Sequence, residues 1–102
     1  MKRKTKIKPN RPIAVHPGKV LQSILDDNEI SQSELSRHLK MPQSKINEIC
    51  RGKRGVSAEM AYKLARVFNS SPEFWLNLQR EWELKEFDEN DFCHITPLKI
   101  RA

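Results

Sequence analysis

Apolar residues along most of the chain recur at spacings of three and four, the period of a helix that buries one face. No stretch alternates with the period of two that predicts a strand. The first helix is expected from near Pro17, because proline suits a first helical turn, to about Asp27–Asn28. Its buried stripe comprises Val20, Leu21, Ile24 and Leu25.

The second helix carries a clear start signal. Ser31 and Glu34 fit the S-x-x-E capping box, in which each side chain satisfies a free backbone N–H group. Leu35 and Leu39 then face inward. Pro42 either ends this helix or begins the next one, because proline is poorly tolerated inside a helix.

A third helix follows after a tight turn. It is predicted from about Gln43 to Arg51, with Ile46 and Ile49 on its inner side. Gly52 is a suitable C-terminal cap, and residues 52–55 are expected to form a loop. Two helices joined by such a turn form a helix-turn-helix, here over residues 31–51.

Two further helices complete an all-α domain of five helices. Ser57 caps the fourth helix. The fifth begins with a cap at Ser71, a proline at the first position and a carboxylate that faces the helix dipole. It is expected to run to about Phe87, with irregular structure past Asp88. The inner side of the fourth helix comprises Met60, Ala61, Leu64, Ala65 and Phe68.

The apolar residues of the fifth helix fall into two sets. One set forms a stripe at helical spacing, which predicts core packing. The other set lies away from that stripe and is harder to bury in so small a domain, so we expect it to contact a second copy of the chain. The stripe comprises Phe74, Trp75, Leu78 and Trp82, and the second set comprises Leu76, Leu84 and Phe87.

Composition argues against a membrane protein. Of the 102 residues, 37% are apolar and 31% are charged. No apolar run approaches the roughly 20 residues that a membrane span needs. The basic N-terminus also lacks the apolar stretch of a signal peptide. We therefore expect a soluble, cytoplasmic protein with no membrane partner.

The sequence gives little indication of a metal site or an enzyme active site. Cys50 and Cys93 lie too far apart for a metal or redox motif, so two reduced thiols are expected. His16, His38 and His94 do not form two pairs at zinc-ligand spacing. No carboxylate constellation, G-x-S-x-G motif or phosphate-binding glycine loop indicates catalysis. We expect a protein that is not an enzyme and holds no metal or cofactor.

The net charge of +6 is unevenly distributed. Residues 1–12 hold six basic side chains and no acidic one, so the remaining chain is net neutral. Within that remainder, residues 31–55 carry a net charge of +4 and residues 72–94 a net charge of −5. The helix-turn-helix segment can therefore face phosphates, and the acidic segment can face a basic partner.

Polar side chains gather at the leading end of the third helix. Because Ile46 and Ile49 hold this helix against the core, its outer side is left to short or flexible polar residues, which a helix in the major groove needs there. Asn and Gln can pair with adenine through two hydrogen bonds, and Lys can reach guanine or a phosphate. The expected base contacts are Gln43, Ser44, Lys45 and Asn47.

Three stretches of the sequence are distinctive: His16-Pro17-Gly18, INEICRGKRGVSAEMAYKLARVF at 46–68 and SSPEFWLNLQREWEL at 70–84. They resemble the Xre/Cro family of helix-turn-helix repressors, and more closely its HigA (VapI) antitoxin branch. The resemblance covers roughly residues 13–85 and implies a lambda-repressor-like fold. Two features depart from the family pattern: Pro42 stands where relatives often have a Ser or Thr cap for the third helix, and the arm at residues 1–12 is additional.

The resemblance also implies partners. It aligns Gln32 with a side chain that bonds a DNA phosphate, and it places Lys53 and Arg54 in a loop near the DNA backbone. It implies a homodimer on a palindromic, double-stranded operator. The implied role is a repressor of its own toxin–antitoxin operon that neutralises a HigB-type toxin, an mRNA-cleaving ribonuclease.

The expected organisation has three parts. Residues 1–15 form a flexible basic arm, residues 16–87 a helix-turn-helix DNA-binding domain, and residues 88–102 an irregular tail. The arm is a disordered solubilising tail, a nonspecific grip on phosphates or a reader of the minor groove. The acidic segment at residues 81–91 is either a solvated face or a surface that steers a basic toxin.

Two other functions fit the same residues. A solitary transcription regulator without a toxin would make the same DNA contacts. A protein-interaction module that has lost DNA binding is the second alternative, and the departure at Pro42 is its best support.

Overall fold

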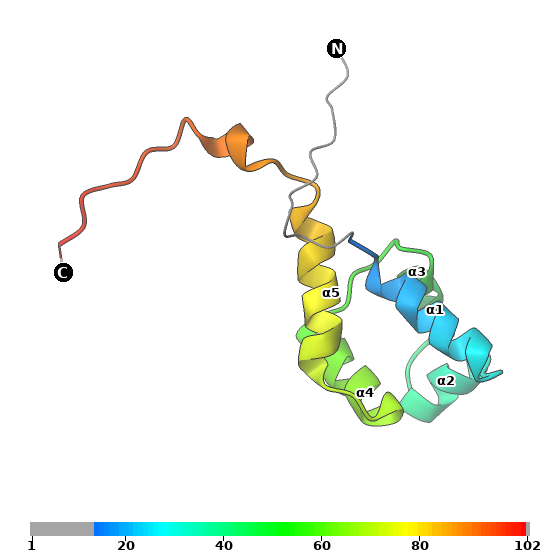
Figure 1. Ribbon diagram of the computed structural model, residues 1–102. Coiled ribbons are helices and arrows are strands. Elements are labelled where there is room, and N and C mark those ends of the chain that lie inside the picture. The colour runs from blue at the N-terminus through cyan, green and yellow to red at the C-terminus, as the bar shows by residue number, and fades with distance from the viewer. Residues whose placement is uncertain (1–13, 102) are drawn as a thin grey trace, which may run out of the picture.

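The computed structural model describes residues 14–101, so the basic arm at residues 1–12 lies outside the described residues. Within this range the chain folds into five α-helices and no strand, which confirms the all-α prediction (Figure 1). A single 3₁₀ turn follows the last α-helix. The elements are α1 (Pro17–Asp27), α2 (Gln32–Leu39), α3 (Gln43–Cys50), α4 (Ala58–Phe68), α5 (Pro72–Leu84) and η1 (Glu89–Phe92).

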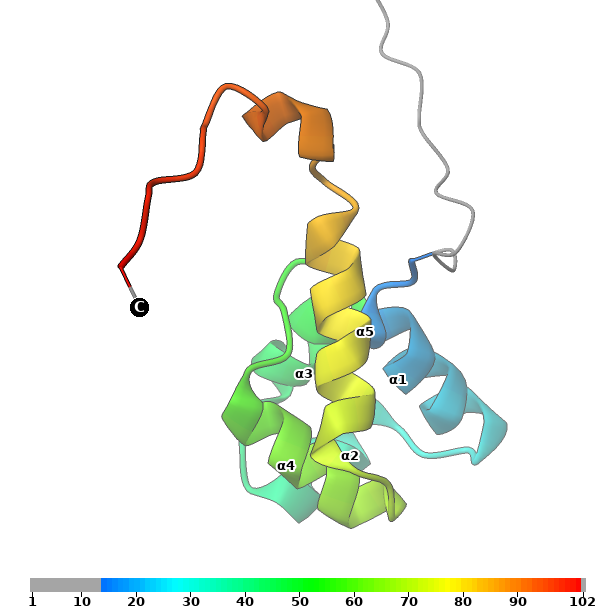
Figure 2. The same cartoon turned by 60° about the vertical axis from the view of Figure 1, so that its left-hand side comes forward.

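The core lies where the inner faces of the five helices meet. Trp75 of α5 is completely buried, and its indole N–H donates to Ser70 Oγ at 3.1 Å, so the largest core side chain has no unsatisfied polar atom. Figure 2 shows α5 at the front, running along α4 and past α1, against which it packs. The buried cluster comprises Leu21, Leu25, Leu35, Ile46, Ile49, Val56, Met60, Ala61, Leu64 and Trp75.

Four helices begin at a side chain that accepts a hydrogen bond from the first turn. Ser31 Oγ accepts from the Glu34 N–H at 2.9 Å, which is the serine half of the predicted capping box. Ser57 and Ser71 cap α4 and α5 in the same way. The fourth cap is His16, whose Nδ1 accepts from the Gly18 N–H at 2.8 Å at the start of α1. Each predicted serine cap is confirmed.

Helix α3 has an uncapped start and a well-bonded end. Pro42 precedes it in extended conformation and accepts no side-chain hydrogen bond from the first turn. The cap that Ser or Thr supplies in relatives is therefore absent here. At the other end Gly52 has a φ of 77°, in the left-handed region that glycine adopts at no steric cost. The N–H groups of Gly52 and Lys53 donate to the carbonyls of Ile49 and Glu48, which is the Schellman arrangement.

One prediction about the fifth helix and one about the chain after it are wrong. Helix α5 ends at Leu84, not near Phe87, and two further residues follow as a tightened turn. The last turn of α5 carries no basic side chain but includes Glu83, and negative charge is unfavourable at a helix C-terminus. The chain past Asp88 is also not wholly irregular, because Asp88 caps η1.

The core stripe of α5 differs from the predicted one. Trp75 is buried, and Leu78 packs against the core, but Phe74 is 44% exposed and only covers the edge of the Trp75 ring. Conversely, Leu76 is partly buried against the core, although the sequence placed it away from the stripe. Residues 74 and 76 each lie about 100° from Trp75 on opposite sides of the helix, so spacing alone does not reveal which flank is covered.

Helices α1 and α3 are in close contact at Gly18. A Cβ atom at this position would overlap the carbonyl oxygen of Ile49, a backbone atom that cannot move aside without moving α3. Glycine is therefore required here by packing and not by its own backbone angles. This contact sets how deeply α3 sits against the rest of the domain.

Replacing Gly18 with alanine should destabilise the fold by roughly 2–4 kcal/mol, because overpacking against backbone forces two helices apart. Urea unfolding followed by circular dichroism measures the loss. Lys19→Ala, on the exposed side of the same helix, is the matched control and should change the unfolding free energy by less than about 0.5 kcal/mol. Equal stability of the two variants would contradict the packing argument.

Candidate nucleic-acid interface

Helix α3 presents a polar edge to solvent because its opposite side is buried. Ile46 and Ile49 are 0% and 1% exposed, which fixes the rotation of this eight-residue helix about its axis. The same rotation leaves Gln43, Ser44 and Lys45 exposed in its first turn. These are three of the four residues that the sequence nominated for base contacts. Their donors and acceptors are free to meet base edges.

The fourth nominated residue, Asn47, lies in a chain of side-chain hydrogen bonds. Its Nδ2 donates to Gln32 Oε1 at 3.2 Å, and Gln32 Nε2 donates to Gln22 Oε1 at 2.8 Å. Gln22 in turn donates to Asp26 Oδ1 at 2.8 Å. This amide chain joins α3 to α2 and α1. Asn47 is half-buried, so it braces the polar edge as well as belonging to it.

The loop after α3 is held at three points. Its first residues complete the Schellman bonds described above. The Arg54 guanidinium then contacts a single Glu48 oxygen through two nitrogens, at 2.7 and 2.8 Å. Finally, Gln79 Oε1 of α5 accepts from the Val56 N–H at 2.8 Å, and Gly55 leaves room for that amide. The loop thereby presents Lys53, an exposed side chain, beside the end of α3.

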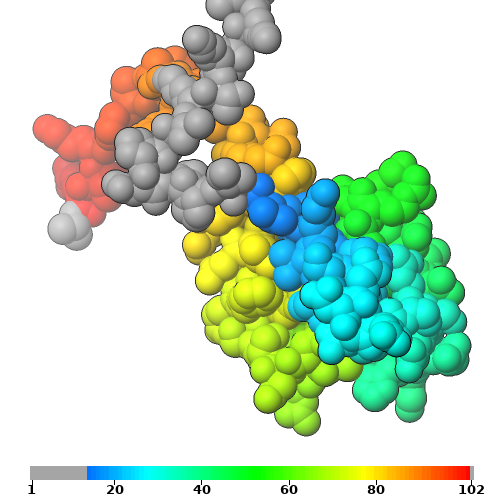
Figure 3. Space-filling view, turned by 45° about the vertical axis from the view of Figure 1, so that its right-hand side comes forward, coloured from blue at the N-terminus to red at the C-terminus, as the bar shows by residue number. Residues whose placement is uncertain are grey.

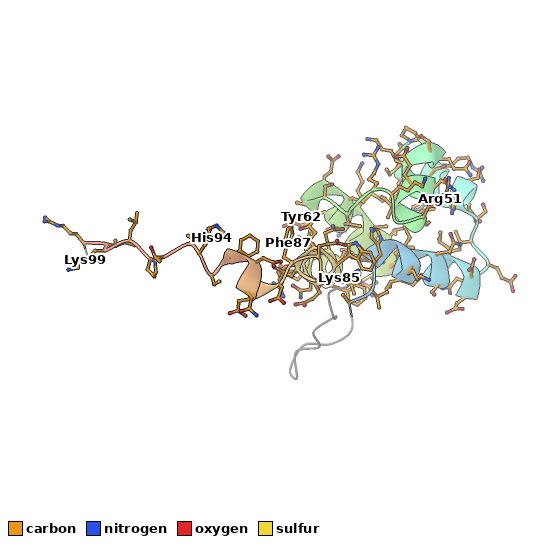
Figure 4. The ribbon with its side chains drawn as sticks, turned by 90° about the horizontal axis from the view of Figure 1, so that it is seen from above. Arg51, Tyr62, Lys85, Phe87, His94 and Lys99 are labelled. Carbon is orange, nitrogen blue, oxygen red and sulfur yellow. The ribbon has the colours of Figure 1, made fainter. Side chains whose placement is uncertain are left out.

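The basic side chains of this region lie on one part of the surface. Arg51, Lys53 and Arg54 are exposed at the end of α3 and in its following loop. Figure 4 shows Arg51 at the opposite end of the molecule from Lys99 in the C-terminal tail. The cationic surface is thus separated from the chain that follows α5. A band of cations beside the polar edge of α3 is the arrangement that combines phosphate contacts with base contacts.

His16 lies next to this loop at the point where the described chain begins. The His16 ring meets the Trp82 ring edge-on at a centroid distance of 5.3 Å, and Gly52 lies next to the His16 ring. Figure 3 shows the start of α1 (blue) beside the loop after α3 (green). The described chain therefore begins beside the candidate interface. Burial lowers the pKa of His16 below its usual value of 6.5, because desolvation disfavours the imidazolium.

The two cysteines form no disulfide bond, and the Cys50 thiol is unreactive at neutral pH. Burial, with a smaller contribution from the negative charge of Asp26, raises the pKa of the Cys50 thiol to about 11. The thiol is therefore protonated at neutral pH. Among residues 14–101, no three His, Cys, Asp or Glu side chains lie close enough to hold a metal ion. In the same range no helix is both long and apolar enough to cross a membrane.

Sequence reasoning missed the residues that support the interface. Gln22 and Gln79 hold the polar edge and the loop from α1 and α5, respectively. Glu48 is different, because the sequence left open that it supports the loop instead of the outer face, and it does bind Arg54. No motif marks Gln22 and Gln79, because their partners Gln32 and Val56 lie 10 and 23 residues away along the chain. The only signal was that each is a polar residue next to the buried positions of its helix.

Comparisons with known proteins agree with this geometry. The helix-turn-helix family model HTH_3 matches residues 21–75. Virulence-associated protein A′ of Dichelobacter nodosus is 44% identical over 75 residues, covering 72% of this chain and 65% of that protein. Virulence-associated protein I of the same organism is 36% identical over 96 residues, covering 91% of this chain and 89% of that protein.

One of the similar solved structures was determined with DNA. The Pseudomonas aeruginosa antitoxin HigA, determined with the higBA promoter, is 38% identical to this chain and has a TM-score of 0.75. The match covers 85% of this chain and 100% of that one. At 38% identity the two chains are related in sequence as well as in fold.

The lowered pKa of His16 predicts that the fold loses stability in mild acid. The folded state favours neutral His16, so its contribution is complete above the unfolded pKa near 6.5 and is lost as pH falls through the folded pKa. The free energy of unfolding should therefore decline between pH 7 and pH 5.5. Urea titrations across this range measure the decline.

Asparagine at position 16 can still cap α1 but cannot titrate, so His16→Asn should flatten this pH dependence. His38→Gln, which removes an exposed histidine, is the control and should retain the wild-type slope. Identical slopes in wild type and His16→Asn would show that His16 does not carry the effect.

Proposed function

The chain belongs to the helix-turn-helix family HTH_3, in the HigA (VapI) antitoxin branch of the Xre/Cro repressors, and from this premise we propose that it is a repressor and antitoxin. As a repressor it reads the operator of its own toxin–antitoxin operon. As an antitoxin it neutralises a HigB-type ribonuclease encoded beside it. The observation that carries the proposal is the exposed polar edge of α3, braced by the amide chain and flanked by basic residues.

In this proposal α3 enters the major groove with its N-terminal turn leading. Gln43, Ser44 and Lys45 contact base edges, and Asn47 contributes from a braced position. Gln32, at the start of α2, bonds a phosphate while its Oε1 holds Asn47. The remaining contact group is the loop after α3. Its phosphate contacts are Lys53 and Arg54, the latter oriented by Glu48.

A two-fold operator requires a dimer, and the end of α5 is the proposed contact. Leu84 and Phe87 are 45% and 61% exposed there. Leu76, the third residue expected at this contact, packs against the core of its own domain, so we assign it no more than a supporting role. Residues 16–87 then form the DNA-binding domain, preceded by the basic arm (1–15) and followed by the tail (88–102).

One alternative is disfavoured by a specific observation. The module without DNA binding rested on the proline at position 42, yet α3 begins at the next residue and keeps its polar edge exposed. Pro42 has a φ of −63° and a ψ of 138°, which are ordinary values for a residue that precedes a helix. The solitary regulator would use the same interface, and a test for the toxin separates it from the antitoxin.

Replacing Gln43 and Lys45 with alanine should weaken binding to the natural operator by about 10- to 1000-fold and reduce the preference for operator over random DNA. The reason is that each lost base contact removes about 1–3 kcal/mol of discrimination. Fluorescence anisotropy with operator and scrambled duplexes measures both affinities. Lys63→Ala with Arg66→Ala, on α4, is the matched control and should leave the preference intact.

Lys53→Ala provides the contrast within the interface. This variant should weaken binding to operator and scrambled DNA alike and lower the slope of log affinity against log salt by about one. Full operator preference in Gln43→Ala/Lys45→Ala would contradict the docking of α3. A loss of preference in Lys53→Ala would contradict the division between base and phosphate contacts.

Co-expression with the adjacent open reading frame tests the antitoxin role. If that frame encodes a toxin, its expression alone should stop growth, and co-expression of this chain should restore it. A reporter fused to the shared promoter should be repressed at the same time. Repression without any toxic neighbour would favour the solitary regulator, and failure to repress would count against both.

A further inference from the structure

We propose that Asp26 and Gln22 of α1 are positioning residues for DNA recognition, because they fix which atoms of Asn47 are left to face a base. The inference rests on the proposed function and deepens it, since it concerns how the polar edge of α3 selects its bases. Both residues lie outside the helix-turn-helix, on a helix that packs against α3 (Figure 1). They act on α3 through the amide chain that joins α1 to α2 and α3.

A row of hydrogen-bonded amides can run in either of two directions. The oxygen and the nitrogen of an Asn or Gln side chain exchange places when the amide turns over, and only its partners decide between the two orientations. If every amide in the row turns over, each bond is kept with its donor and acceptor exchanged. A row made of amides alone therefore has no preferred direction. A group that can only accept, placed at one end, removes this freedom.

Asp26 is such a group at the α1 end of the amide chain. A carboxylate offers no N–H, so Gln22 must turn its nitrogen toward it, and Gln22 Nε2 donates to Asp26 Oδ1 at 2.8 Å. The two residues are four positions apart on α1, the spacing at which Gln and Asp side chains meet on a helix. The Gln22 oxygen is thereby left for Gln32, from whose Nε2 it accepts at 2.8 Å.

The direction set by Asp26 reaches Asn47 through Gln32. Because the Gln32 nitrogen is bonded to Gln22, its Oε1 is the atom left for α3, and Asn47 Nδ2 donates to it at 3.2 Å. Asn47 keeps one N–H group of Nδ2 and its Oδ1, which accepts no hydrogen bond within residues 14–101. One acceptor and one donor are therefore left at this point of the polar edge.

An acceptor and a donor together match adenine. In the major groove adenine presents its N6 amino group as a donor and N7 as an acceptor, whereas guanine presents two acceptors, O6 and N7. If the chain ran the other way, Asn47 Oδ1 would be bonded to Gln32, and the N–H groups left over would match guanine. The carboxylate of Asp26 therefore makes Asn47 prefer adenine to guanine without itself touching the base.

Asp26→Asn tests this inference, because asparagine can donate as well as accept and so releases the direction of the chain. In the natural operator each adenine of the two half-sites is changed in turn to guanine, which replaces the N6 donor with the O6 acceptor and keeps N7. Asn47→Ala identifies the position that Asn47 reads, as the one at which the preference for adenine is lost. Fluorescence anisotropy measures every affinity.

At that position the wild type should favour adenine by about 5- to 150-fold, the range of a paired base contact. In Asp26→Asn the preference should fall to within about threefold, because both directions of the chain are then populated. The guanine operator should be bound more tightly than by the wild type, while binding to the natural operator weakens by no more than about twofold. A variant that merely loosened the fold would bind both operators less well.

Two further variants separate direction from charge. Asp27→Asn removes the same charge from the next residue of α1, which is also exposed, and should keep the wild-type preference. Gln22→Glu combined with Asp26→Asn moves the carboxylate one step along the chain, at the same net charge as the wild type. Gln32 must then donate to that carboxylate, so the original direction and the preference for adenine should return.

Three results would overturn the inference. They are an unchanged preference in Asp26→Asn, an equal loss of preference in Asp27→Asn, and no recovery in the double variant. A scan in which Asn47→Ala alters the preference at no position would also overturn it. Failure of the wild type to bind the operator would contradict the proposed function. Operator binding with a preference indifferent to Asp26 would contradict this inference alone.

Discussion

The close approach of α1 to α3 at Gly18 is the constraint on which the rest of the structure depends. A helix of eight residues is too short to persist in water by its own hydrogen bonds, and α3 also starts without a side-chain cap. Its helical state therefore comes from packing. Ile46 and Ile49 supply the buried area, and the absence of a side chain at Gly18 lets the backbone of α1 reach the Ile49 carbonyl.

The same contact lies beside the groups that hold the candidate nucleic-acid interface. His16 precedes Gly18 by two residues, caps α1 through the Gly18 N–H and lies next to both Trp82 and Gly52. Helix α5 therefore touches the loop after α3 twice, through Trp82 and His16 and through the Gln79 amide. Helix α5 thus helps to position the loop, whereas the basic residues of the loop follow directly after the helix-turn-helix. Both links use neutral polar groups, so they do not compete with phosphate for cations.

The sequence predicted features that depend on neighbours along the chain. The three serine caps, the proline starts and the glycine after α3 each act within one or two turns, and all appear where expected. The errors concern relations between helices. Phe74 and Leu76 flank Trp75 symmetrically, and only the positions of the neighbouring helices decide that Leu76 is the covered one. The links from Gln22 to Gln32 and from Gln79 to Val56 span 10 and 23 residues, beyond any local rule.

The proposed function requires one small domain to serve two partners, and the arrangement of its surfaces is compatible with that requirement. The basic groups around α3 and the acidic segment after Arg80 lie on different elements, and the exposed apolar residues Leu84, Phe87 and Phe92 lie at the end of α5 and after it. Since α3 is oriented from within the domain by Gly18 and the amide chain, a protein that bound these apolar residues would leave the polar edge of α3 in place.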